Sequence, residues 1–451
     1  MMRVCGTLAS VVFGLSLVST TAARANPAAT VPSGADPGKP ISFHFGLDYD
    51  YELDKATITR ELTGGDQDPL DGTLRRPDLE FRQSRHLLIP RLDIGLAPDT
   101  WLSFALPVTI AQSRQLSLAS GVDRSQSSTL LDALLPPEGF DARDPGTPPP
   151  GDLIFRGEKR SGIDQVHVGL NFAMFNQHRD DTKPTWKIGG ELRLAAGRIM
   201  TFDPRNPSET TGVSTGVHEL RLWTTVDRQF RWNEAWFELF WQTPIWTRDR
   251  SLFADPGFGS RSVKPSQQAG VAFGLETFVM NDRANNHKIS VDIGSRVVGH
   301  FEGRAYTEMW EVFAYAGDPR GGGPLILDGD PATDGVQPLR HPGISNVENY
   351  LETAAQVAVR AAVGPRIRFA ALAKLAWKTD HVISFADAGI DLPHCEGAAM
   401  TSCETAIDNI VTPGTREVNP LHVPRIDLVG HRYRSEDNFG LVLGIESQVL
   451  W

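Results

Sequence analysis

NFGLVLGIESQVLW, residues Asn438 to Trp451, closes the chain and sets the question of its fold. Apolar side chains occupy every second position of this stretch, with one interruption at Ser447, and the positions between hold mainly glycine, glutamate and glutamine. Alternation with a period of two is typical of a β-strand with one apolar and one polar face. Strand ends of soluble proteins usually pass into solvated turns, so we ask which solvent the apolar face meets.

The same alternation recurs along the whole chain. It covers about twelve stretches, most of them near the roughly 9–11 residues that a tilted strand needs to cross a bilayer. The stretches are residues 41–51, 87–97, 101–110, 165–175, 186–197, 218–227, 235–246, 270–279, 288–298, 350–363, 366–377 and 438–451.

Charged residues occur on only one face of these stretches. The other face carries residues such as Leu92, Phe273 and Val357 and no Asp, Glu, Lys or Arg. A charge that faces lipid near the bilayer midplane costs roughly 2–4 kcal/mol, whereas a charge in a watery lumen costs little. The sequence therefore predicts an all-β fold, a transmembrane antiparallel up-and-down β-barrel of about twelve strands. The residues predicted to line its lumen are Asp48, Arg91, Asp93, Glu191, Arg193, Glu219, Arg221, Glu238, Glu276, Asp292, Arg296, Arg360, Arg368 and Lys374.

Short and long connections alternate between the predicted strands. The short ones lie at Pro98-Asp99, around Asp180, Arg231 and Asn285, and at Gly364-Pro365. The long ones are residues 54–80, 113–163, 200–216, 248–265, 302–345 and 381–435. Short periplasmic turns and long extracellular loops are typical of outer-membrane barrels. An even strand number then places both ends of the barrel in the periplasm.

Aromatic residues near the strand ends predict belts at the two membrane interfaces. The periplasmic belt would contain Trp101, Trp186, Trp232, Trp236 and Trp451, and the outer belt Tyr51, Trp246, Tyr350 and Trp377. We therefore expect Trp451 to lie at the inner interface of the membrane. Its strand resembles the signal that barrel assembly machinery recognises, and the other expected partners are outer-membrane lipid and lipopolysaccharide.

The first residues have the pattern of an export signal. Arg3 precedes the apolar run Leu8–Val18, which is too short to span a bilayer, and the small residues around Arg24 form a cleavage site. We expect residues 1–25 to be a cleaved signal peptide, residues 26–40 a short periplasmic segment, and residues 41–451 a barrel in the outer membrane of a Gram-negative cell.

Composition excludes nucleic acid as a partner and predicts one disulfide. The 451-residue chain has a formal net charge of -11, which does not suit the phosphates of nucleic acid. Cys395 and Cys403 would be the only cysteines left after cleavage, and an exported chain folds in an oxidising compartment, so we expect them to pair.

Histidines and acidic residues raise an enzymatic alternative. His44 and His167 have inward parity and His218 precedes Glu219, but none lies in a recognisable nucleophile or zinc motif. The acidic stretch 327–335 departs from the spacing of a calcium loop. We therefore expect no catalytic residue, metal or cofactor. An outer-membrane hydrolase acting on lipid or lipopolysaccharide, and a structural or adhesive barrel with partner-binding loops, remain as alternatives.

Two segments carry a family resemblance: RLDIGLAPDTWLSFALPV, residues 91–108, and IDQVHVGLNFAMFNQHRDDTKPTWKIGGELRLAAG, residues 163–197. In these segments the chain resembles outer-membrane channels associated with degradation of phenol and other aromatics, which are distantly similar to fatty-acid channels. The features that carry the resemblance are the hairpin with Gly95-Leu96 and Asp99 and the strand that ends at Leu106-Pro107. Gly162-Ile163-Asp164 only approximates the glycine-aspartate signature of that group. The resemblance covers about a third of the chain, implies a channel for small apolar molecules and assigns no catalytic residue.

The leading hypothesis is a channel for passive diffusion of small molecules, aromatic or other apolar solutes among them, through a charged and narrow lumen. About twelve strands give a width between filled small barrels and open porins. The inward charged side chains would line the path of the solutes, or they would pair with one another and fill the lumen. A simple hairpin register places Arg360 opposite Arg368, which would create a basic wall across the lumen from Glu219, Glu238 and Glu276.

Overall fold

The computed structural model describes residues 31–35, 40–62, 74–253, 264–282, 285–328, 335–386 and 421–451. The expected signal peptide and the Cys395–Cys403 disulfide lie outside the described residues and stay predictions.

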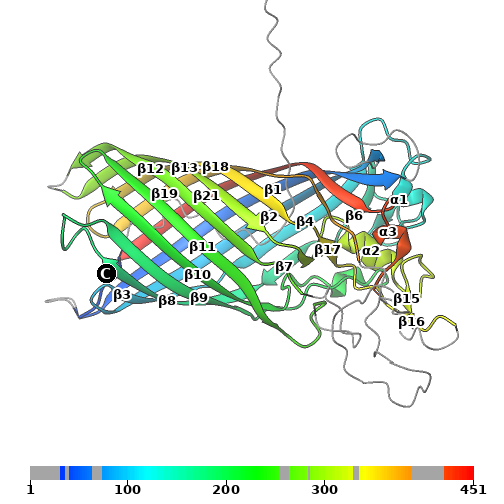
Figure 1. The fold of residues 1–451 in the computed structure, drawn as a ribbon, viewed down its shortest axis with the longest axis horizontal. Helices are drawn as coiled ribbons and strands as arrows, with labels where there is room; N and C mark the ends of the chain where they lie inside the picture. The colour runs from blue at the N-terminus through cyan, green and yellow to red at the C-terminus, as the bar shows by residue number, and fades with distance from the viewer. Residues whose placement is uncertain are drawn as a thin grey trace, which may run out of the picture.

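Twelve antiparallel strands close into one barrel (Figure 1), as the alternation predicts. Closure comes from β21 pairing with both β19 and β1, with Phe45 opposite Val449 on the seam. The third strand of the circuit is interrupted at Leu106-Pro107 and carries two labels. The barrel strands are β1 (Ser42–Leu62), β2 (Leu74–Ala97), β3 (Thr100–Ala105) with β4 (Val108–Leu118), β8 (Gln165–Phe175), β9 (Thr185–Ala195), β10 (Val217–Gln229), β11 (Asn233–Thr247), β12 (Gln268–Asp282), β13 (His287–His300), β18 (Tyr350–Val363), β19 (Ile367–Lys378) and β21 (Tyr433–Leu450).

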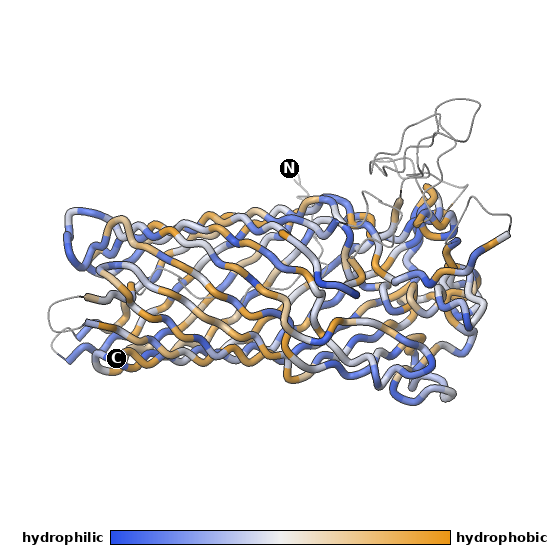
Figure 2. The backbone as a smooth tube through the Cα atoms, turned by 90° about the horizontal axis from the view of Figure 1, so that it is seen from below, coloured by the Kyte–Doolittle hydropathy of each residue, from blue (hydrophilic) through white to orange (hydrophobic). Residues whose placement is uncertain are grey.

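The outward face of the barrel is apolar and the inward face is charged. Phe45, Leu239 and Ile293 are exposed on the outside, whereas Asp292, next to Ile293, is fully buried inside. Figure 2 shows the resulting alternation of hydrophobic and hydrophilic residues along the strands. In the part of the chain that the structure describes, no helix is long and apolar enough to cross a membrane. An apolar outside around a charged inside is the architecture of an outer-membrane β-barrel.

Several strands are longer than a membrane crossing requires, which corrects the predicted loop at residues 54–80. β1 has 21 residues and β2 has 24, and they remain paired as far as Leu62 and Leu74. These extensions point Ile58, Leu79 and Phe81 inward, where they join the main hydrophobic core. The extra strand length is therefore stabilised by packing beyond the bilayer.

That core belongs to a cap that the long connections build over one end of the barrel (Figure 1). Trp310 and Phe313 of α2 are fully buried in it, beside Phe155, Phe202 and Tyr433. The short elements of the cap and the adjoining rim are α1 (Ser128–Leu131), β5 (Phe140–Asp141), β6 (Leu153–Arg156), β7 (Arg160–Ile163), η1 (Pro207–Glu209), β14 (Gly303–Ala305), α2 (Trp310–Ala316), β15 (Leu327–Asp328), β16 (Pro338–Leu339), β17 (Ser345–Val347), β20 (His381–Val382) and α3 (Pro424–Asp427).

The aromatic belts are only partly as predicted. Trp232, Trp246 and Trp451 are exposed near strand ends. Trp101 and Trp236 are instead buried inside the barrel, because each has inward parity on its strand. Tyr350 is also buried and stacks between two histidine rings, with centroids 4.3 Å from His300 and 4.2 Å from His381.

Candidate functional site

Two cavities follow one another along the lumen. The larger has a volume of about 630 Å³ and reaches the short turns, since Asn286 and Gly364 help to line it. We call it the periplasmic cavity, because the sequence predicts that the short turns face the periplasm. The smaller, which we call the central cavity, has a volume of about 180 Å³. Arg91 and Asp93 line both, so the two cavities adjoin at that point of β2.

The periplasmic cavity is predominantly acidic. Seven carboxylates and four cationic side chains line it among the described residues. The carboxylates are Asp48, Asp93, Asp227, Glu234, Glu276, Asp282 and Glu446, and the cations are Arg91, Lys288, Arg360 and Arg368. An acidic chamber at one end of a pore favours cations over anions at that end.

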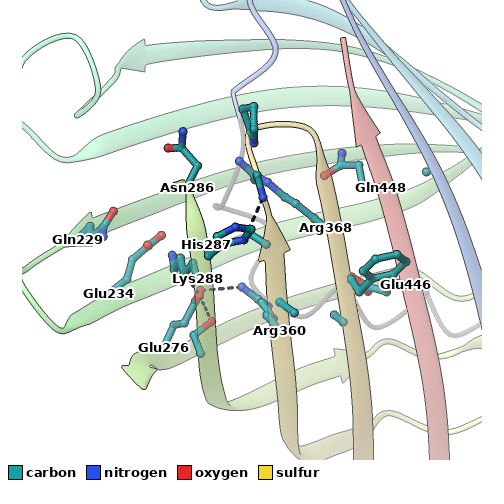
Figure 3. A pocket seen from close by; sticks show the side chains of 18 of the residues that line it. Gln229, Glu234, Glu276, Asn286, His287, Lys288, Arg360, Arg368, Glu446 and Gln448 are labelled. Atoms are coloured by element: carbon teal, nitrogen blue, oxygen red, sulfur yellow. Dashed lines mark hydrogen bonds and ion pairs between the residues drawn. The ribbon is translucent and has the colours of Figure 1, made fainter. Parts of the chain in front are cut away.

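Arg360 is the centre of an ion-pair network in the wall of the periplasmic cavity (Figure 3). Its guanidinium group donates to Glu276 at 2.7 Å and to Asp292 at 3.0 Å, so β18 is tied to β12 and β13. Asp292 also accepts the indole N–H of Trp236 at 2.9 Å, and Glu276 accepts the hydroxyl of Ser290 at 2.5 Å. Both carboxylates are almost fully buried, so these partners replace the hydration that each has lost.

This network overturns the expected separation of charge into two opposing walls. The turn after β18 pairs Val363 with Ile367, which places Arg360 opposite Ala370 and Arg368 opposite Ala362. Arg360 and Arg368 are therefore not direct neighbours across the hairpin, and the simple register was wrong. Glu276 lies within hydrogen-bond distance of Arg360, so acidic and basic residues pair locally instead of facing one another across the lumen.

The central cavity has the opposite balance. Six cationic side chains and four carboxylates line it among the described residues. The cations are Arg85, Arg91, Arg193, Arg221, Arg296 and Lys374, and the carboxylates are Asp93, Asp164, Glu191 and Glu238. Four of the five arginines pair with a carboxylate. Arg193 donates to Glu191 at 2.7 Å and Arg221 donates to Glu238 at 2.6 Å. Arg85 pairs with Glu52 and Arg91 with Asp48, so most of the positive charge in this cavity is compensated.

Tryptophan side chains supply the apolar part of the central cavity. Trp101, Trp223 and Trp236 line it, and the last two face glycines across the sheet, Gly189 and Gly274 respectively. A methyl group built on either glycine would lie 2.4 Å or 2.7 Å from the indole ring, so only glycine lets these rings lie against the wall. The inward tryptophans were not predicted as site residues, although Trp236 shares the parity of Glu238.

Most of the predicted lumen residues line one of the two cavities, and the structure brings several together. Glu219 and Asp292 line neither, but both lie inside: Glu219 accepts amide hydrogens from Gln165 and Gln242 at 2.9 Å each. Lys374 lines the central cavity and pairs with Glu352 at 3.3 Å, and Asp48 pairs with Arg91.

The chain before β1 turns back into the barrel. Val31 lines the periplasmic cavity and Pro32 lines the central cavity. Ser33 fixes this segment, because its hydroxyl accepts the backbone N–H of Asp99 at 3.0 Å and a hydrogen bond from Arg179 at 2.9 Å. Residues 31–35 therefore narrow the lumen at the end where the short turns lie.

Buried charges also organise the cap at the other end. Arg160 donates to Glu311 at 2.8 Å, and its guanidinium carbon lies 4.9 Å from the centre of the Trp310 ring. Burial lowers the pKa of His341 to about 3. Burial also raises the pKa of Asp427 to about 7, although the Val423 N–H and the positive charge of Arg304 favour its ionised form.

Several histidines among the described residues have polar partners. His86 shares a 2.8 Å hydrogen bond with Tyr49, and His341 accepts the backbone N–H of Gly343 at 3.0 Å. His167 lies 3.7 Å from Glu191 in the central cavity. Among the described residues there is no group of three or more His, Cys, Asp or Glu side chains that could hold a metal ion.

No protein-family model and no curated protein matches the chain. The solved structures that it matches include a Pseudomonas aeruginosa FadL homologue, with 8% identity, 91% of this chain and 90% of that chain covered, and a TM-score of 0.30. A deltaS2 mutant of the TodX monoaromatic hydrocarbon channel has 8% identity, coverage of 92% and 90%, and a TM-score of 0.30. The outer membrane protease OmpT from Escherichia coli has 8% identity, coverage of 90% and 97%, and a TM-score of 0.27. At such TM-scores these similarities indicate neither a family nor an activity.

Proposed function

We propose that the protein is an outer-membrane channel through which small molecules diffuse passively. The observation that carries this proposal is the pair of adjoining, charge-lined cavities inside a barrel whose outside is apolar. A structural barrel could fill its interior with apolar or fully paired side chains. This barrel instead keeps a volume of about 630 Å³ next to its short turns, lined by groups that bind water and ions.

The charge layout favours a narrow and selective path over an open pore. Ion pairs such as Arg360 with Glu276 and Arg221 with Glu238 hold long side chains against the wall. Residues 31–35 enter one end, and the cap packs over the other end. A solute that crosses therefore passes the cap, the central cavity with its ion-paired arginines, and the acidic periplasmic cavity in turn.

Planar-bilayer recording of the purified protein in potassium chloride tests the proposal. We expect discrete current steps, smaller than those of an open porin because the central cavity has a volume of only about 180 Å³. Heat-modifiable gel migration shows in parallel that the barrel is folded. Folded protein that inserts into the bilayer and never conducts would reject the channel and favour a barrel whose loops bind partners.

A further inference from the structure

Two exposed cations face one another on the outside of the barrel, in the halves of β1 and β2 that lead to the cap. Lys55 of β1 is the direct cross-strand partner of Arg82 of β2, and both side chains are exposed. The Cβ atoms of directly opposite residues lie about 4.5–5.5 Å apart, and like charges in that position repel. Among the residues that the structure describes, neither side chain forms an ion pair or a hydrogen bond.

A third cation lies close to this pair. The guanidinium group of Arg143 donates to the hydroxyl of Ser113 at 2.6 Å and to a backbone carbonyl at 2.9 Å, so both of its partners are neutral. Ser113 of β4 is opposite Ser84, which is two residues from Arg82 along β2. We call Lys55, Arg82 and Arg143 the basic patch.

Nearby carboxylates do not neutralise the basic patch. Asp141 pairs with Arg156 at 3.2 Å instead. Glu80 is exposed on the same face of β2, and among the described residues it forms no ion pair. Glu158 acts on Arg143 through its charge, without an ion pair. The basic patch therefore keeps a positive charge that a partner outside the protein can offset.

The basic patch lies where the apolar band of the barrel ends. The outward positions of β1 from Phe43 to Leu53 carry no charge, and this stretch of 11 residues matches the roughly 9–11 residues of a bilayer crossing. Lys55 is the next outward position. On the neighbouring strand the ring of His86 lies 5.0 Å from that of Tyr51, and rings of this kind mark a membrane interface. The patch therefore lies at the level of lipid headgroups, on the side of the long connections that the sequence predicts to be extracellular.

We propose that the basic patch binds a phosphate group of lipopolysaccharide in the outer leaflet of the membrane. A phosphate monoester carries a charge of about -1.5 to -2 and three acceptor oxygens, so it offsets the repulsion between Lys55 and Arg82 and accepts their hydrogen bonds. The guanidinium groups of Arg82 and Arg143 present paired donors that match phosphate oxygens. This site does not depend on the proposed channel function, because a barrel that never conducts would still carry it.

Native mass spectrometry of the purified, folded protein in mild detergent tests the site. The probes are lipid A with both phosphates, lipid A without phosphates, and phosphatidylglycerol. We expect phosphorylated lipid A to bind at least ten-fold more tightly than either of the other two. Equal binding of the two forms of lipid A would overturn the proposal, as would equal binding of phosphatidylglycerol. Displacement of lipid A by inorganic phosphate would show a site for the free ion and would also overturn it.

Three variants locate the binding. Lys55→Gln combined with Arg82→Gln should weaken the binding of phosphorylated lipid A at least ten-fold. Arg231→Gln combined with Arg366→Gln is the matched control, because it removes the same charge from exposed positions in the short turns. Glu80→Gln should strengthen binding at least two-fold, because it removes a negative charge that repels the phosphate.

Unchanged binding in the Lys55 and Arg82 variant, or an equal loss in the control, would place the lipid elsewhere. Heat-modifiable gel migration shows that each variant is folded. If the Lys55 and Arg82 variant does not fold, Glu80→Gln decides the matter, because unchanged binding in that variant would overturn the proposal.

Discussion

Replacing Arg360 by methionine would leave two buried carboxylates without their shared cation. Glu276 and Asp292 have exposed side-chain fractions of 2% and 0%, and Arg360 has 14%. Removing one partner of a fully buried pair costs about 3–5 kcal/mol. Because Arg360 keeps some contact with the water of the periplasmic cavity, we expect Arg360→Met to lower the free energy of unfolding by about 2–4 kcal/mol.

Urea unfolding of the barrel in lipid vesicles, followed by tryptophan fluorescence, measures this change. With a slope of about 3 kcal/mol per molar urea, the midpoint should fall by roughly 1 M. Arg366→Met is the matched control, because Arg366 is exposed in the adjacent turn, and its midpoint should stay unchanged.

A compensating variant tests the electrostatic cause. In Arg360→Met, Lys288 still lies 3.4 Å from Glu276, but both carboxylates have lost the cation that they shared. Adding Glu276→Gln and Asp292→Asn removes the two negative charges, and at least half of the lost stability should return. Reversal potentials of Arg360→Met in a salt gradient should also shift toward cation preference. An unchanged urea midpoint in Arg360→Met, or no recovery in the triple variant, would refute the reasoning that this network holds the wall together.

Three further predictions follow from other parts of the molecule. Gly189→Ala should reduce single-channel conductance and cost about 1–3 kcal/mol of stability, because its methyl group would lie 2.4 Å from the Trp223 ring and push it into the central cavity. Gly190→Ala is the control and should change neither, because its methyl group would lie 3.4 Å from Leu222, an ordinary van der Waals distance. Asp427 has a folded-state pKa raised to about 7 by burial, so its contribution to cap stability is present below about pH 4 and is lost as the pH rises toward 7. Proteolytic nicking of the cap should therefore be at least ten-fold faster at pH 8 than at pH 5, and Asp427→Asn should remove that difference. Mass spectrometry of the native protein should find Cys395 linked to Cys403, and two free thiols would contradict the predicted disulfide.

The barrel itself could be predicted from the sequence because the bilayer imposes a rule on every strand. Outward positions such as Ile293 avoid charge and inward positions such as Asp292 tolerate it, so a period of two reveals the two faces without knowledge of any pairing. The same rule, applied to tryptophan, would have placed Trp236 inside with Glu238. Position near a strand end therefore does not identify a belt tryptophan by itself, because the parity of the residue decides whether the ring faces the lipid or the lumen.

Register and cap could not be predicted in the same way. The three-residue turn after β18 pairs Arg368 with Ala362, whereas a tighter turn would pair it with Arg360. Both arginines point inward in either register, so the hydrophobic pattern gives no signal that distinguishes the two. The cap depends on contacts between segments far apart in sequence. Arg60, for example, donates to Asp132 and Tyr433, and no local period encodes such contacts.

Thiol block of single-channel current tests most directly whether the lumen is the path for solutes. Gln448→Cys places a thiol in the periplasmic cavity, Ser103→Cys places one in the central cavity, and Ile445→Cys places one on the outward face of β21, where the native side chain is 60% exposed. A charged, water-soluble thiol reagent should reduce the current through the first two variants and leave the third and the native protein unchanged. Current that persists through both lumen variants after complete labelling would show that solutes do not cross through these cavities.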